Sequence, residues 1–172
     1  MPNYYIGTAK VGIGCEEENG KLTYIDLPNT YGFKDRELAG KLKIGDRLLF
    51  YVAPNWGFVM DIEVQEGYVG PITDKLKDFP FRVNVKVLCE IRDKQMMPKW
   101  SDLWHHLHKC QGKSPKGAAQ ILRKPIIPID EHDYKLIAAA IRQGKGKTKQ
   151  GLSPTDFVEG IRELLQRYDQ KT

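Results

Sequence analysis

The run RLLFYV at residues 47–52 constrains the fold most, because it is almost wholly apolar and stands between two turns. The turn KIGD precedes it, APNW follows it, and GFVMDIEVQEGYVG then returns as a second strand. A strand with so continuous an apolar run is buried on both faces or lies in a barrel. The segment therefore predicts a β-hairpin inside a curled sheet.

Strand patterns fill the first 92 residues. Further strands are predicted at 3–11, 20–25 and 79–91, where aromatic and β-branched residues stand between turn signals. Within the last of these, Arg82, Asn84 and Lys86 alternate with three valines, which predicts one solvated face. Carboxylates such as Asp61 and Glu63 on the hairpin are likewise expected to be exposed. Closely spaced strands of this kind favour a small β-barrel.

Helix patterns take over after Trp100. Amphipathic helices are predicted at 101–110, at 130–142 and at 153–170, with Ser101 and Asp130 as N-caps of the first two. Strands followed by helices predict an α+β fold, a small β-barrel with flanking α-helices. The expected organisation is one domain at 1–143, a basic flexible linker at 144–151 and a C-terminal helix at 152–172.

The net charge of +5 is concentrated in two acid-free stretches, at 109–124 and at 142–150, which together hold nine cations. Without those nine, the chain has 18 basic residues against 22 acidic ones. Concentrated positive charge is what a polyanion-binding surface needs, although solvated lysine-rich loops are a common alternative. No apolar run approaches the roughly 18 residues that a membrane span requires. With an odd number of cysteines and no signal-peptide pattern, we expect a cytoplasmic protein.

Motifs for catalysis and cofactor binding are missing from the sequence. It contains no GxSxG elbow, no P-loop and no Rossmann fingerprint. The run WHHLHKC pairs His106 with Cys110 and His105 with His108 at helical spacing, but the two pairs point in different directions. We therefore predict no catalytic residue, no metal and no cofactor, and a protein that binds rather than an enzyme.

Four aromatic residues stand in or beside polar segments, namely Tyr31, Phe33, Trp56 and Tyr68. Trp56, in the hairpin turn, either caps the end of the barrel or forms the exposed wall of a binding site. Aromatic faces stack on nucleobases, worth about 1–3 kcal/mol per base, while cations hold the phosphate backbone. A flipped base can be enclosed by such side chains while its edge is read by hydrogen bonds.

Six ordered motifs resemble the EVE domain family over about residues 3–142. They are NYYIG at 3–7, YGF at 31–33, KIGDRLLFYV at 43–52, EVQEGY at 63–68, FPFRVNVKV at 79–87 and IDEHDYKLI at 129–137. That family belongs to the PUA-like superfamily and is related in fold to the YTH readers of methylated adenine in RNA. The resemblance implies a small PUA-like barrel with a pocket for a modified base. It also implies a role as the N-terminal specificity module of a modification-dependent restriction GTPase.

The expected function is a reader that flips a modified base, such as N6-methyladenine or 5-methylcytosine, into an aromatic pocket. Duplex DNA is the favoured partner, and a further domain or subunit is expected beyond the C-terminal segment. The alternatives are an RNA-binding PUA-like module and an EVE protein that binds a small molecule or nucleotide. The predicted pocket consists of Asn29, Thr30, Tyr31, Gly32, Phe33, Asn55, Trp56 and Tyr68. The predicted contacts to the nucleic-acid backbone are Lys34, Arg36, Lys109, Lys113, Lys116, Arg123 and Lys124.

Overall fold

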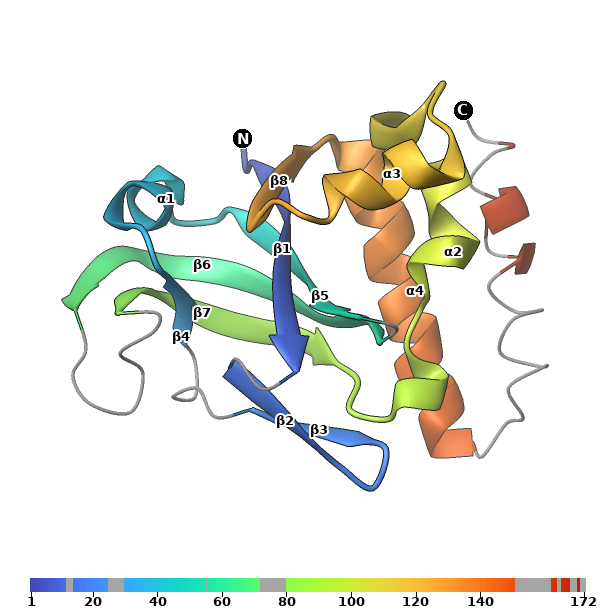
Figure 1. Ribbon diagram of the computed structural model, residues 1–172, viewed down its shortest axis with the longest axis horizontal. Helices are drawn as coiled ribbons and strands as arrows, with labels where there is room; N and C mark the ends of the chain where they lie inside the picture. The colour runs from blue at the N-terminus through green and yellow to red at the C-terminus, as the bar shows by residue number, and fades with distance from the viewer. Residues whose placement is uncertain are drawn as a thin grey trace.

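The computed structural model describes residues 1–11, 14–24, 30–54, 56–71 and 80–150, together with 162–163, 165–167 and 170 (Figure 1). Its strands are β1 (Tyr4–Val11), β2 (Gly14–Glu18), β3 (Lys21–Tyr24), β4 (Thr30–Phe33), β5 (Arg47–Ala53), β6 (Gly57–Pro71), β7 (Phe81–Glu90) and β8 (Ile126–Ile129). Its α-helices are α1 (Arg36–Lys41), α2 (Trp100–Leu103), α3 (Pro115–Ile121) and α4 (Glu131–Gln150), and its 3-10 turns are η1 (Lys94–Met96), η2 (Trp104–His106) and η3 (His108–Cys110).

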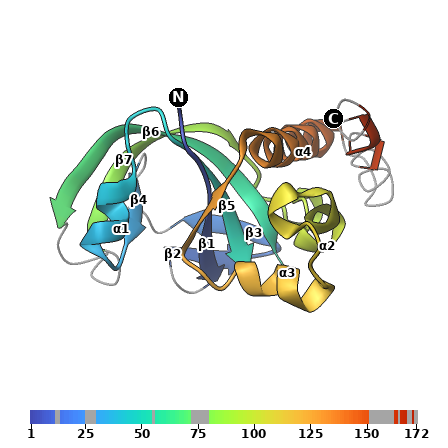
Figure 2. The ribbon, with the colours of Figure 1, turned by 90° about the horizontal axis from the view of Figure 1, so that it is seen from above.

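The strands form one mixed sheet in the order β3-β2-β1-β5-β6-β7-β4. Strand β1 runs parallel to β5, from Tyr4 opposite Arg47 to Lys10 opposite Ala53, and β8 pairs with the first half of its other edge. The sheet curls, with α4 on one side of the molecule and α1 near β4 at the other (Figure 2). The predicted α+β class, with a curled sheet and flanking helices, is confirmed.

The core lies between the curled sheet and α4. Every residue of β5 from Leu48 to Val52 is buried, as its apolar run predicted, and β5 forms the expected hairpin with β6. On α4 the predicted stripe of Ile137, Ala140 and Ile141 is fully buried. Asp130 is the predicted N-cap of α4, because its carboxylate accepts a hydrogen bond from the Asp133 backbone N–H at 2.9 Å.

The helix predicted at 101–110 is instead the short α2 followed by the turns η2 and η3. The reason is a competing acceptor, since both carboxylate oxygens of Asp133 take backbone N–H groups, from His108 at 2.7 Å and from Lys109 at 2.9 Å. Helix α3 forms in turn where a loop was expected. Ser114 accepts from the Gly117 backbone N–H at 3.1 Å, and proline occupies the first helical turn.

The predicted solvated face of β7 is wrong in part. Arg82 is fully buried, whereas Val87 is 37% exposed. The pairing of β6 with β7 shifts register between Asp61 and Ile62, so that alternation along β7 does not continue unbroken. A β-bulge of this kind changes which side chains face the core, and a period-two reading of the sequence cannot see it.

Asp61, expected to be exposed, is buried under α4. The Tyr134 hydroxyl donates a hydrogen bond shared between the two Asp61 oxygens, at 3.0 and 3.2 Å. The Arg142 guanidinium forms an ion pair with the same carboxylate at 2.9 Å. Burial raises the pKa of Asp61, and the hydrogen bond and charge of Arg142 oppose that rise. Because Asp61 lies on β6 and both of its partners lie on α4, this network ties the helix to the sheet.

The basic stretch expected to be a flexible linker from residue 144 belongs to α4, which continues through Gln150. Within the predicted C-terminal helix, Arg162 and Glu163 and then residues 165–167 are helical, and the remainder lies outside the described residues. Among the parts of the chain that the structure describes, no helix is both long enough and apolar enough to cross a membrane.

Candidate nucleic-acid interface

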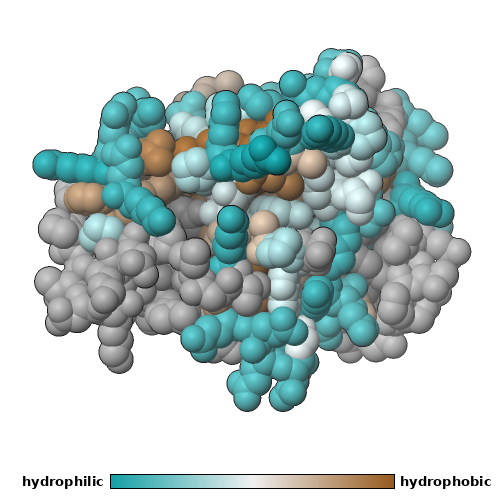
Figure 3. All heavy atoms as spheres, in the orientation of Figure 1, coloured by the Kyte–Doolittle hydropathy of each residue, from teal (hydrophilic) through white to brown (hydrophobic). Residues whose placement is uncertain are grey.

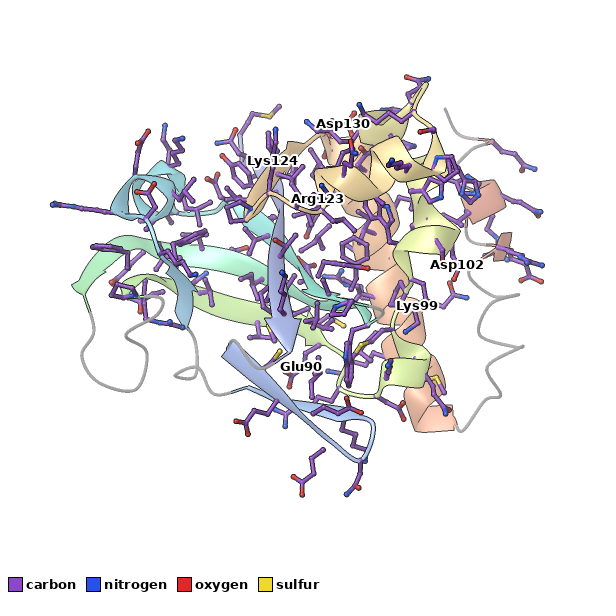
Figure 4. All side chains as sticks on the ribbon, viewed as in Figure 1. Glu90, Lys99, Asp102, Arg123, Lys124 and Asp130 are labelled. Atoms are coloured by element: carbon purple, nitrogen blue, oxygen red, sulfur yellow. The ribbon has the colours of Figure 1, made fainter. Side chains whose placement is uncertain are left out.

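Five of the predicted phosphate-binding cations lie on and around α3. All five are exposed, and the chain from the first of them to Ile129 contains no acidic residue. They are Lys109, Lys113, Lys116, Arg123 and Lys124. Figure 4 shows Arg123 and Lys124 beside β8, and Figure 3 shows hydrophilic side chains on the same face. We call this set the α3 basic surface.

The backbone beneath the α3 basic surface is anchored to β1. The Thr8 hydroxyl donates to the Lys124 carbonyl oxygen at 2.8 Å, and the Thr8 backbone N–H donates to the Pro125 carbonyl oxygen at 3.1 Å. Strand β8 then continues the attachment by pairing with β1. The cations are therefore long, solvated side chains on a backbone that is attached to β1. A polyanion could bind them without further ordering of that backbone.

Lys34, directly after β4, and Arg36, the first residue of α1, form a second exposed basic group. In both Figure 1 and Figure 2, α1 and α3 lie on opposite sides of β1. The two basic groups are therefore separate features of the surface.

Two of the predicted pocket residues lie on the strands that flank β7, although their side chains lie outside the described part of the structure. Tyr31 on β4 and Tyr68 on β6 are both register partners of Val83 on the strand between them. Thr30 and Gly32 occupy the neighbouring positions of β4, opposite Asn84 and Arg82. The backbones of β4, β7 and β6 thus place these residues at one end of the sheet.

Phe33 lies on the same short strand but is only 3% exposed, so it belongs to the core rather than to an open wall. Its register partner is Phe81 at the start of β7. Asn29 and Asn55, which were expected to read the edge of the base, lie outside the described residues.

The expectation that Trp56 is exposed is wrong, because only 3% of its surface is accessible. The chain around η1 and α2 covers it. The Lys99 ammonium donates a hydrogen bond to the Trp56 carbonyl oxygen, and the Lys94 Nζ lies 4.9 Å from the centroid of the Trp56 ring. The next residue, Gly57, has a φ of +148°, and a Cβ there would collide with the Pro98 carbonyl oxygen. Trp56 therefore closes the core at the hairpin turn.

Trp56 is also far from the other predicted pocket residues. It precedes the first residue of β6, while Tyr68 lies near the last, so that about 40 Å of extended chain separates them at the usual rise per residue. Figure 1 shows the start of β6 next to α4 and its other end next to α1 and β4. The structure does not bring Trp56 together with Tyr31 and Tyr68.

Comparison with known proteins adds information about the fold. The sequence matches no protein-family model and no curated protein. Among solved structures, it is similar to the YTH domain of mmi1 in complex with RNA, with a TM-score of 0.55, 8% identity, and coverage of 88% of this chain and 87% of that chain. It is also similar to the YTH domain of Zygosaccharomyces rouxii MRB1 in complex with N6-methyladenosine RNA, with a TM-score of 0.51, 12% identity, and coverage of 81% and 84%.

A further similar structure is human THYN1 in complex with DNA that contains 5-methylcytosine, with a TM-score of 0.45, 14% identity, and coverage of 80% and 97%. The two YTH domains show that this chain has the YTH fold. The YTH-related fold implied by the sequence resemblance is thereby confirmed.

Proposed function

We propose that this protein is a nucleic-acid reader that accepts a modified base, with no catalytic step of its own. The observation that carries the proposal is the α3 basic surface, five exposed cations on an anchored frame in a chain with the YTH fold. Cations arranged in this way bind the phosphate backbone whatever the sequence of bases. Recognition of the base then requires a separate pocket.

The pocket in this proposal lies at the β4 end of the sheet, with Tyr31 and Tyr68 as its aromatic residues. Thr30 and Gly32 supply the adjacent backbone. Trp56 and Phe33 are removed from it because both are buried. Lys34 and Arg36, exposed just after β4, would contact the phosphates next to the flipped base.

DNA is the partner that the sequence resemblance favours, within a modification-dependent restriction system in the cytoplasm. RNA is a second candidate, supported by the two YTH domains, which are in complex with RNA and with N6-methyladenosine RNA. Fold similarity at 8% and 12% identity does not carry a ligand from one protein to another, so the choice depends on a binding experiment.

The experiment is fluorescence anisotropy with matched duplex DNA, single-stranded DNA and RNA probes. Each probe carries adenine, N6-methyladenine, cytosine or 5-methylcytosine at one central position. We expect one methylated probe to bind at least tenfold more tightly than its unmodified partner, a difference of about 1.4 kcal/mol. Equal, salt-sensitive binding to every probe would contradict base recognition. Binding of a free nucleoside without salt dependence would instead support a small-molecule site.

A further inference from the structure

Four side chains able to bind a metal gather where η3 meets the start of α4. They are His108, Asp130, His132 and Asp133, and one potential ligand atom from each lies within 4.8 Å of the others. An open pocket of about 380 Å³ lies at this cluster, lined by His108, Lys109, Pro128, Ile129, Asp130 and Asp133. Figure 4 shows Asp130 at the edge of the molecule, beside α3. The cluster is separate from the proposed base pocket at β4.

The distances within the cluster resemble those of a compact ligand set. The His108 Nδ1 lies 2.8 Å from the Asp130 Oδ2, and the His132 Nδ1 lies 3.1 Å from the Asp133 Oδ1. The two imidazole rings stack at 3.8 Å with an interplanar angle of 6°. Four ligand atoms placed about 2.0–2.2 Å from a tetrahedral zinc ion are about 3.4 Å apart. Because a bound ion lies in the plane of each imidazole that holds it, the stacked His108 and His132 rings would rotate apart as both turn a nitrogen toward the ion.

The carboxylates are already oriented by the backbone. Asp133 is 0% exposed, and its two oxygens accept from the His108 and Lys109 backbone N–H groups at 2.7 and 2.9 Å. The other oxygen of Asp130 accepts from the Asp133 backbone N–H at 2.9 Å. Supporting hydrogen bonds of this kind hold metal ligands in place before the ion arrives.

We propose that His108, Asp130, His132 and Asp133 bind a divalent transition-metal ion of the zinc class. Two imidazoles favour such an ion over magnesium or calcium, which prefer oxygen ligands, and two carboxylates balance its charge. The ligands come from two segments, residue 108 and residues 130–133. The ion would therefore cross-link η3 to the N-terminus of α4 and fix the α3 segment that lies between them.

Sequence spacing alone does not reveal this site. The pairs His105 with His108 and His106 with Cys110 were considered on one continuous helix, but that helix is broken at Leu107. His108 then meets residues that lie more than twenty positions later in the chain. Only the fold brings the four ligands together.

The test begins with the full chain freed of metal by a chelator and dialysed. Zn²⁺ is titrated by calorimetry, and Co²⁺ is added separately to follow its visible absorption. We expect one Zn²⁺ per chain, tetrahedral Co²⁺ bands, and a rise in melting temperature, because an ion that binds only the folded state stabilises it.

Two variants and a matched control locate the ion. Both His108→Ala and His132→Ala should weaken Zn²⁺ binding by more than the roughly 10–100-fold that loss of a supporting hydrogen bond costs. The control, His105→Ala, removes an exposed histidine three residues from His108 and should leave Zn²⁺ affinity unchanged. The proposal is overturned if the wild-type chain binds no Zn²⁺ stoichiometrically. It is also overturned if binding survives in both variants, or if it is lost in His105→Ala.

Discussion

Replacing Trp56 by alanine is expected to destabilise the protein by about 3–5 kcal/mol, the usual cost of deleting a buried tryptophan side chain. The ring is 3% exposed, and it is covered by the segment that holds Lys94 and Lys99. Its removal leaves a cavity between the hairpin turn and that segment, and also removes the contact with the Lys94 ammonium. Urea unfolding followed by circular dichroism measures the loss.

A matched control is Trp104→Ala, because Trp104 is only partly buried on η2. Its loss should cost clearly less than the loss of Trp56. If Trp56→Ala instead kept the stability of the wild type and weakened oligonucleotide binding, Trp56 would be a wall of the binding site and its burial would be contradicted.

Removing charge from the α3 basic surface is expected to have the largest effect on binding. Glutamine at Lys113, Lys116, Arg123 and Lys124 removes four cations from exposed positions, where stability depends little on them. Each duplex-DNA phosphate that loses its cation lowers the slope of log affinity against log salt by about 0.9. The variant should therefore lose about 3.6 from that slope, equally for modified and unmodified probes.

The control removes the same number of cations elsewhere. Lys10, Lys21, Lys86 and Arg92 are exposed on β1, β3, β7 and the segment after β7, so that their replacement by glutamine matches the change in net charge. We expect the salt slope of this control to stay within about one unit of the wild type. Equal losses in both variants would show that binding follows net charge, and the α3 basic surface would have no special role.

Local sequence patterns correctly predicted the elements whose burial follows from the residues of the element itself. The apolar run of β5 is buried as predicted, and the stripe of α4 with its Asp130 cap lies where helical spacing places it. The burial of β5 and the stripe and cap of α4 depend mainly on residues close by in the same element. The α+β class follows from their order along the chain.

Predictions failed where a distant segment decides the outcome. Trp56 is covered by a segment about forty residues later, and the polar neighbours in its own turn give no sign of it. The helix expected at 101–110 is interrupted because Asp133, on another helix, captures two of its backbone N–H groups. The four possible metal ligands likewise converge only through tertiary packing.

For the candidate site, the five cations of the α3 basic surface are exposed, and their contact with phosphates stays a prediction. The aromatic pocket also stays a prediction, from which the burial of Trp56 and Phe33 removes two members. Tyr31 and Tyr68 are aligned by the pairing of β4, β7 and β6, a register that could not be read from either segment alone. The sequence prediction grouped Trp56 with Tyr31 and Tyr68 because all three stand in or beside polar segments. In the fold, most of β6 separates Trp56 from Tyr68.

The most direct test of the central claim is the ratio of dissociation constants for an unmodified probe and its methylated partner. It should be measured side by side in the wild type, Tyr31→Ala, Tyr68→Ala and the control Tyr31→Phe, which keeps the aromatic ring. We predict a ratio of ten or more in the wild type and Tyr31→Phe, falling close to one in both alanine variants, since base stacking is worth about 1–3 kcal/mol. A ratio that stays high in both alanine variants, or never rises above one for any methylated probe, would contradict the proposed reader.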